Sequence, residues 1–266
     1  MTGLNILKKH VWRIYADFFM PSRLGYYEAL LVKLKSLGYV SLTATAYWHA
    51  LKSGDLPPLG LILRHDVDTS PSIARRQWEI ESRLGLKSTF YFRWRTFDLP
   101  LIREIEASGN EVGYHYEELS DFAKRHHIHK AELVKAELAA IKELFVENLR
   151  RFRSMTGLPA RTVAAHGDFV NRRLKLTNAV ILENDPELRA RSSILFDAYD
   201  QEVMAGVSSS LSDYPLPAFW QPCSPEEALA DAPKLLYILI HCRYWFCRPY
   251  ENLRDDLWRF WEGLTW

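Results

Sequence analysis

Short apolar runs at four places in this chain lead into side chains that can bind a metal or transfer a proton. The runs occupy 59–63, 112–114, 162–165 and 235–240, and they lead into Asp66, Asp68, His115, His166 and His241. Apolar runs of this length predict strands that are buried on both faces, as in a parallel sheet. Because parallel strands in a barrel gather site residues at their carboxyl ends, we expect these side chains to lie close together.

The first of these runs ends in two carboxylates, Asp66 and Asp68. Residues i and i+2 of a strand point to the same side, so both acids can face one pocket while Val67 points away. Two acids there suit a metal-assisted hydrolase, in which one holds the cation and the other handles a proton. A strand that runs into a solvated acidic turn is the alternative, and the three later runs favour the site.

Helical and strand patterns alternate with short loops between 59 and 166. The helical patterns are at 70–85, 99–108 and 129–153, and the strand patterns are at 59–68, 88–92, 111–115 and 162–165. A helical pattern at 21–38 and a strand pattern at 39–42 precede this region. This alternation predicts repeated βαβ units and a parallel sheet covered by helices. Strands that share a central site favour a barrel over a doubly wound sheet. The segment at 170–215 is less regular.

Several helix ends carry recognisable signals. Ser70 precedes a proline and predicts a helix N-cap, and Ser224 opens a capping box. The last helix, expected at 251–264, is amphipathic, and we expect its Trp258 and Trp261 to pack in the core.

Length and composition favour one folded domain. The chain has 266 residues, of which 48% are hydrophobic, enough to bury a full core. We expect a single domain over 1–266, with a helical N-terminal extension over about 1–58 and a barrel over about 59–266. The formal net charge of +1 argues against a nucleic-acid surface.

The N-terminus and the cysteines favour a cytoplasmic protein. The first residues lack the apolar core and cleavage site of a secretory signal. The longest apolar stretch, at 235–240, is shorter than the about 20 residues that span a bilayer, so we expect no transmembrane segment. Cys223, Cys242 and Cys247 form no Cys-x-x-Cys pair and are expected to be reduced.

An ordered series of motifs extends over most of the chain, from about residue 26 to 245. It comprises His-Asp-Val-Asp at 65–68, Ser-Thr-Phe-Tyr-Phe at 88–92, Gly-Tyr-His-Tyr-Glu-Glu at 113–118, His-Gly-Asp at 166–168, Ser-Asp at 212–213 and Leu-Ile-His-Cys-Arg-Tyr-Trp at 239–245. This series resembles the polysaccharide deacetylases, the NodB-like group of carbohydrate esterase family 4. It looks most like a branch that begins with His-Asp-Val-Asp and is linked to bacterial surface-polysaccharide or O-antigen synthesis.

The resemblance implies an α/β fold, a distorted (β/α)₇-type barrel, and hydrolytic removal of an acetyl group from a sugar. An N-acetyl group is favoured over an O-acetyl group. By the motif positions, Asp66 is the general base and Asp68 a metal ligand. His115 is a second ligand, His241 the general acid, and Asp213 the acid that polarises His241.

One expected ligand is missing from the second motif. The family usually has a histidine four residues after the first, where this chain has Leu119. Glu117, Glu118 and His166 are candidates for the vacant role. We favour His166, which ends its own strand and precedes Gly167, a residue that lets the backbone approach a ligand closely.

The family's third motif also has an arginine that tethers the base, and the local Ala-Ala-His-Gly-Asp has none. Arg64, Arg93 and Arg161 are candidates, and the sequence does not choose among them. Arg93 and Glu117 are also expected to contact substrate.

Tryptophans follow several expected strand ends. Trp94, Trp220 and Trp245 are placed either to stack on sugar rings or to pack in the interior. We assign Trp245 to substrate binding.

The inferred chemistry requires a divalent cation held by one carboxylate and two imidazoles. Zinc fits such a set best, and cobalt, nickel or iron also accept nitrogen and oxygen ligands. His126, His127 and His129 stand among basic residues and are expected at a solvated helix end, with no metal role.

The sequence therefore predicts a metal-dependent deacetylase whose partner is an acetylated sugar or a nucleotide- or lipid-linked glycan precursor. An amidohydrolase acting on a non-sugar C–N bond would use the same site. A catalytically silent relative that binds saccharide or metal is the third hypothesis, because two family residues are missing.

Overall fold

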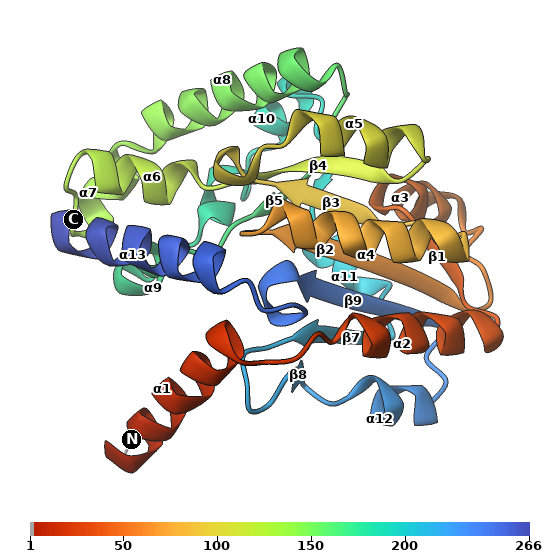
Figure 1. The fold of residues 1–266 in the computed structure, drawn as a ribbon. Coiled ribbons are helices and arrows are strands. Elements are labelled where there is room, and N and C mark those ends of the chain that lie inside the picture. The colour runs from red at the N-terminus through yellow and green to blue at the C-terminus, as the bar shows by residue number, and fades with distance from the viewer. Residues whose placement is uncertain (1–2) are drawn as a thin grey trace.

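A sheet of eight parallel strands and one antiparallel strand forms the centre of the computed structural model, which describes residues 3–266 and, within its first helix, side chains from residue 10 onward (Figure 1). The strands are β1 Val40–Leu42, β2 Gly60–Val67, β3 Thr89–Phe92, β4 Glu111–Tyr116, β5 Thr162–Ala165, β6 Phe196–Asp197, β7 Ser209–Asp213, β8 Trp220–Gln221 and β9 Leu235–His241. Their order in space is β6-β5-β4-β3-β2-β9-β7-β8. β1 adds to the start of β2, and β8 is antiparallel to β7.

Helices surround this sheet. They are α1 Gly3–Phe18, α2 Leu24–Ser36, α3 Ala44–Ser53, α4 Pro71–Leu84, α5 Leu99–Ala107, α6 Glu118–Arg125, α7 Ala131–Ala136, α8 Leu138–Thr156, α9 Phe169–Leu174, α10 Pro186–Arg191, α11 Gln201–Ala205, α12 Pro225–Ala230 and α13 Pro249–Thr265. Short 3₁₀ turns at Trp94–Thr96 and Cys242–Tyr244 follow β3 and β9. Within residues 3–266, no helix is both long enough and apolar enough to span a bilayer.

The sheet curls because its inner side chains pack on one another. Every residue of β2 is buried, and its side chains alternate between an outer face and an inner face. Ile62 on the inner face of β2 shares a core cluster with Phe196 of β6 and Tyr237 of β9. Since β6 and β9 are far apart in the ladder, this contact bends the sheet into a partial barrel.

The barrel is closed by side chains and helices instead of by hydrogen bonds. In the described part of the chain, no ladder joins β6 to β7. Ala44 and Tyr47 of α3 fill the amino end, and the Tyr47 hydroxyl donates to the Val203 carbonyl of α11 at 2.6 Å. The predicted fold class, a distorted (β/α)₇-type barrel, is confirmed.

Outside the sheet, two apolar layers hold the helices. Tyr114 and Tyr116 of β4 pack on Phe145 of α8, and Tyr27 of α2 packs in a second cluster with β2 and β9. This alternation leaves the inner positions of the same strands free for polar side chains.

The expected strands and most expected helices are present, with two local differences. The helix predicted at 129–153 is broken at Glu137 into α7 and α8, and α6 precedes it. His126, His127 and His129 therefore lie in the connection between α6 and α7. Ser224 forms the predicted capping box with Glu227.

Ser70 occupies the predicted N-cap position of α4, and Pro71 follows it as the first helical residue. Ser70 holds a left-handed backbone conformation, with φ of 47°, and its hydroxyl caps no backbone amide of the helix. The prediction that Trp258 and Trp261 pack in the core is wrong, because α13 turns both rings to solvent.

Candidate metal and acid–base site

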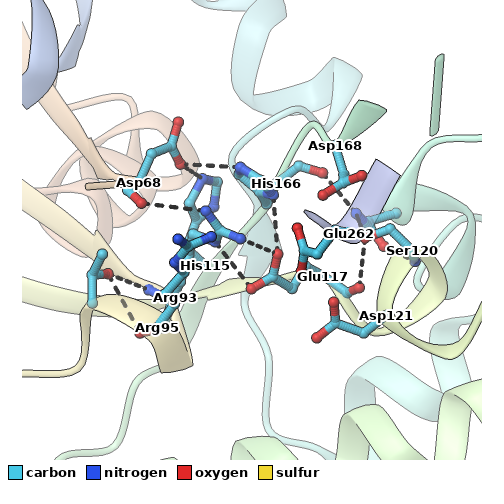
Figure 2. Close-up of polar contacts among 12 residues, drawn as sticks. Asp68, Arg93, Arg95, His115, Glu117, Ser120, Asp121, His166, Asp168 and Glu262 are labelled. Carbon is cyan, nitrogen blue, oxygen red and sulfur yellow. Dashed lines mark hydrogen bonds and ion pairs between the residues drawn. The ribbon is translucent and has the colours of Figure 1, made fainter. Parts of the chain in front are cut away.

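The carboxyl ends of β2, β4, β5 and β9 bring together the side chains predicted from the sequence. Asp68 directly follows β2, His115 lies within β4, His166 directly follows β5 and His241 ends β9. Figure 2 shows Asp68, His115 and His166 facing one another. The inner register positions of neighbouring strands make this convergence possible.

One carboxylate and two imidazoles form a potential metal-binding triad. Asp68 Oδ1 lies 3.1 Å from His115 Nε2 and 3.3 Å from His166 Nε2, and ligand atoms of the three residues all lie within 4.8 Å of one another. Two ligand atoms bound to one tetrahedral zinc ion stand about 3.3 Å apart, given Zn–N and Zn–O bonds of about 2.0–2.2 Å. Asp68 Oδ1 is also buried without a hydrogen-bond partner in the described chain. The donor set therefore fits a divalent cation.

Both histidines of the triad are oriented by a second contact. His115 Nδ1 lies 2.8 Å from the Ala164 carbonyl on the neighbouring strand, so its N–H donates there and Nε2 presents a lone pair. His166 Nδ1 lies 3.3 Å from Glu117 Oε2. Burial, together with the positive charge of Arg93, lowers the pKa of His166 and favours the neutral ring. Metal-bound histidines are commonly held in this way.

The structure separates the three candidates for the missing ligand. His166 reaches the Asp68–His115 pair directly. Glu117 lies behind His166 and pairs with Arg93. Glu118 points away, where it accepts hydrogen bonds from the Tyr114 hydroxyl at 2.5 Å and from the Asn148 amide at 2.9 Å.

A second group of possible ligands, Glu117, His166 and Asp168, lies beside the triad. Its charges are already balanced within the protein. Arg93 pairs with Glu117, and Lys124 lies 3.3 Å from Asp168 Oδ2. Asp168 also caps α9 through a bond from the Val170 amide. These contacts make the Asp68–His115–His166 triad the better cation site.

Asp66 is held by an arginine from its own strand. Arg64 Nε and Nη2 donate to the two carboxylate oxygens, each at 2.8 Å, and both residues are buried. They can pair because positions i and i+2 share a strand face. Burial raises the pKa of Asp66, but Arg64 and His115 outweigh that effect and lower it overall. Of the three arginines that the sequence left open, Arg64 is therefore the one that binds Asp66.

His241 and Asp213 form an acid–base pair next to Asp66. His241 is the register partner of Asp66 across β2 and β9. Its Nδ1 lies 2.6 Å from Asp213 Oδ1, and Asp213 Oδ2 accepts from the His241 amide and from Trp245 Nε1, each at 2.7 Å. Burial lowers the pKa of His241, but Asp213 outweighs it and raises the pKa to about 9.

The prediction that Trp245 contacts substrate is wrong. Its side chain is fully buried, and its indole N–H is bonded to Asp213. Trp220 packs on Trp245 in the same interior cluster. Arg93 and Glu117 are the other expected substrate contacts. Both are buried, and their charged groups form an ion pair with each other.

A buried polar network behind β2 was not predicted. His65 Nε2 lies 2.6 Å from Glu81 Oε1, which also accepts from the Tyr27 hydroxyl, and Ser88 Oγ donates to Glu81 Oε2 at 2.5 Å. The alternation of strand faces places His65 opposite the site. This network anchors the outer face of the strand that carries Asp66.

A cleft of about 540 Å³ opens beside the triad. His166, Arg93 and Asp168 line its inner part. Residues of α1, α9 and α13 line its outer part. The cleft gives a substrate access to one side of the site.

No protein-family profile matches the chain, and no curated protein matches it. One solved structure that matches is a mutant of a CE4 family pseudoenzyme with restored enzymatic activity, at 14% identity and a TM-score of 0.41. The match covers 77% of this chain and 65% of the other, so the chain spans less than two thirds of that protein. A likeness of this extent carries no information about the residues or chemistry of this chain.

Proposed function

We propose that this protein is a metal-dependent hydrolase that removes an acetyl group, preferably an N-acetyl group, from a sugar. One observation carries the proposal. The ligand atoms of Asp68, His115 and His166 converge beside an arginine-bound carboxylate and an aspartate-bound imidazole. A poor electrophile such as an amide needs this combination of cation, base and acid.

The three residues of the triad would hold the cation. When bound, a divalent cation polarises the acyl carbonyl and makes water a better nucleophile. Asp66, kept ionised by Arg64, accepts the proton of the attacking water. Its Oδ2 lies 3.6 Å from His115 Nε2, next to the triad.

His241 supplies the proton that the departing amine requires. Its Nδ1–H donates to Asp213, which leaves the Nε2–H free to donate. With a pKa of about 9, the ring is protonated at neutral pH. The family resemblance and the geometry thus support the same assignment of base and acid.

Zinc is the cation that we propose, because an Asp/His/His set suits it best. The substrate class that we propose is an acetylated sugar within a nucleotide- or lipid-linked precursor of a surface polysaccharide such as O-antigen. Such precursors are assembled in the cytoplasm, where we expect the protein to act.

Two sets of variants test this function. Zinc should copurify or reconstitute at one ion per chain, and Asp68→Ala, His115→Ala and His166→Ala should each lose it. Asp168→Asn, which keeps the α9 cap, and His127→Ala should retain it as matched controls. Acetate release from N-acetylated sugars should fall about 10²–10⁴-fold in Asp66→Asn, which keeps its metal.

Each alternative has its own outcome. Zinc that persists in Asp68→Ala and is lost in Asp168→Asn would move the cation to the second group. Stoichiometric zinc without turnover of any acetylated sugar would indicate a saccharide- or metal-binding protein. Turnover of simple amides in place of sugars would indicate an amidohydrolase on a non-sugar C–N bond.

A further inference from the structure

The helix α13 has the reverse of the usual amphipathic orientation: its polar residues face the protein and its apolar residues face solvent. Its fully buried residues are polar, Asn252 and Asp255. Its large apolar side chains are between 45% and 77% exposed, and they are Tyr250, Leu253, Leu257, Trp258, Phe260, Trp261 and Leu264. A surface helix normally turns its apolar stripe to the core. An exposed apolar stripe of this size indicates a surface that contacts another molecule or a membrane.

The first helix has the same inversion, and its C-terminal half contacts α13 through Arg13 and Asp17. In the part of α1 with described side chains, Asp17 is buried. Val11, Trp12, Ile14 and Tyr15 are between 39% and 58% exposed. We call the exposed apolar side chains of α1 and α13 together the terminal-helix face.

Buried ion pairs fix both helices in this orientation. Arg243, in the 3₁₀ turn after β9, donates to Asp17 of α1 at 3.0 Å, and to Asp255 and Asp256 of α13 at 3.1 and 2.9 Å. Turning either helix to bury its apolar side would break these bonds and expose the partners. The inversion is therefore built into the fold.

Around the terminal-helix face, the negatively charged side chains are paired within the protein and the unpaired charged side chains are positive. Its carboxylates point inward and are paired, as Glu262 is with Lys124 at 3.3 Å. Arg254 of α13 and Arg172 and Arg173 of α9 are exposed. Across residues 3–266, no carboxylate lies within ion-pairing distance of these three arginines. The free charges at the rim are thus positive.

We propose that the terminal-helix face binds the surface of a bilayer that contains anionic lipids. Tryptophan and tyrosine concentrate at the membrane–water interface, and helices with outward Trp, Phe and Leu lie in its plane. The rim arginines would pair with lipid phosphates. A two-fold contact with a second copy would instead bring these like-charged rims together.

Binding in this way would place the mouth of the site at the lipid headgroups. Phe260 and Leu264 of the terminal-helix face also line the cleft that contains His166. If the proposed function holds, a lipid-linked sugar would reach the triad from the membrane side. The membrane contact itself does not depend on that function.

Vesicle sedimentation tests the proposal. The full chain should bind phosphatidylcholine vesicles that contain phosphatidylglycerol, and bind pure phosphatidylcholine more weakly. Trp258→Glu with Trp261→Glu should weaken this binding at least about tenfold, because two large apolar side chains lose their burial. Val32→Glu with Leu37→Glu, which adds the same charge at exposed apolar positions of the α2 region, should not.

A second variant isolates the charge contribution. Arg172→Ala with Arg173→Ala should weaken binding to the anionic vesicles only, and added salt should have the same effect. Circular dichroism and zinc content should remain unchanged in every variant, so a loss of vesicle binding is separate from a failure of the proposed function.

Three results would overturn the proposal. The first is no binding to either vesicle, and the second is equal binding to both. The third is a dimer, seen by light scattering, that the Trp258 and Trp261 substitutions dissociate, because a second copy would then cover the face.

Discussion

At the scale of single residues, Asp213 determines the protonation state of His241. Both oxygens of Asp213 are occupied, by His241 and by Trp245, so this carboxylate is fixed in position. Its negative charge favours the imidazolium form of His241 more than burial disfavours it. The positioning of one aspartate thus sets the charge of the proposed general acid.

Replacement of Asp213 by asparagine should lower the pKa of His241 from about 9, because burial is then opposed only by the smaller effects of Asp68 and Asp66. Proton–carbon NMR of the metal-free protein would follow the titration of the ring. Tyr244→Phe, which alters a neighbouring ring, is the control and should leave the pKa unchanged. An unchanged titration in Asp213→Asn would contradict the assigned pair.

The same pair links stability to pH. The folded-state pKa of His241 lies above its ordinary value of 6.5, so the proton stabilises the fold. This contribution is complete below about pH 6.5 and disappears as the pH rises through about 9. The Asp213→Asn variant lacks it.

At this scale the sequence predicted much of the site. Asp66, Asp68, His115, His166 and His241 could be found because each lies at, or directly after, the carboxyl end of an apolar strand. The arginine that binds Asp66 was left open, although Arg64 stands two residues away on the same strand face. The burial of Trp245 could not be predicted, because aromatic rings suit both a sugar groove and an interior.

At the scale of elements, β4 must approach β3 and β5 closely to deliver His115. Gly113 makes this approach possible. A Cβ atom there would lie 2.4 Å from the Tyr91 ring and 2.7 Å from the Thr162 carbonyl oxygen. The carbonyl belongs to the backbone of β5 and cannot turn aside.

The substitution Gly113→Ala should therefore destabilise the fold by about 1–3 kcal/mol, the usual cost of overpacking. Zinc affinity should fall with it, because His115 lies two residues further along β4. Gly25→Ala, where an added Cβ meets nothing within 4 Å, should stay within about 0.5 kcal/mol. Urea unfolding of the two variants gives the comparison, and equal stabilities would refute the close-packing argument.

The pattern of elements was predictable, while their orientation was not. Apolar periodicity located six of the nine strands and about half of the helices, but it missed β6, β7 and β8 and did not reveal the break at Glu137. Periodicity also identifies an apolar stripe without saying which way it points. The inversion of α13 depends on Arg243 and its carboxylate partners, which come from distant parts of the chain.

At the scale of the whole molecule, a cation at the triad would tie together three segments. Its ligands follow β2, lie in β4 and follow β5, so the unfolded chain offers no comparable site. A ligand that binds only the folded state stabilises it by mass action.

Zinc at about 100 times its dissociation constant should raise the free energy of unfolding by about 2.7 kcal/mol. The gain should disappear with EDTA and in His115→Ala, and remain in His127→Ala. Chemical unfolding with and without the metal measures it. A gain that survives in His115→Ala would place the cation elsewhere.

Anomalous diffraction from crystals of the zinc-loaded protein tests the central claim most directly. The account predicts one peak within about 2.0–2.2 Å of Asp68 Oδ1, His115 Nε2 and His166 Nε2. A peak among Glu117, His166 and Asp168 that lies more than about 3 Å from Asp68 and His115 would contradict it, as would crystals of the loaded protein without a peak at these residues.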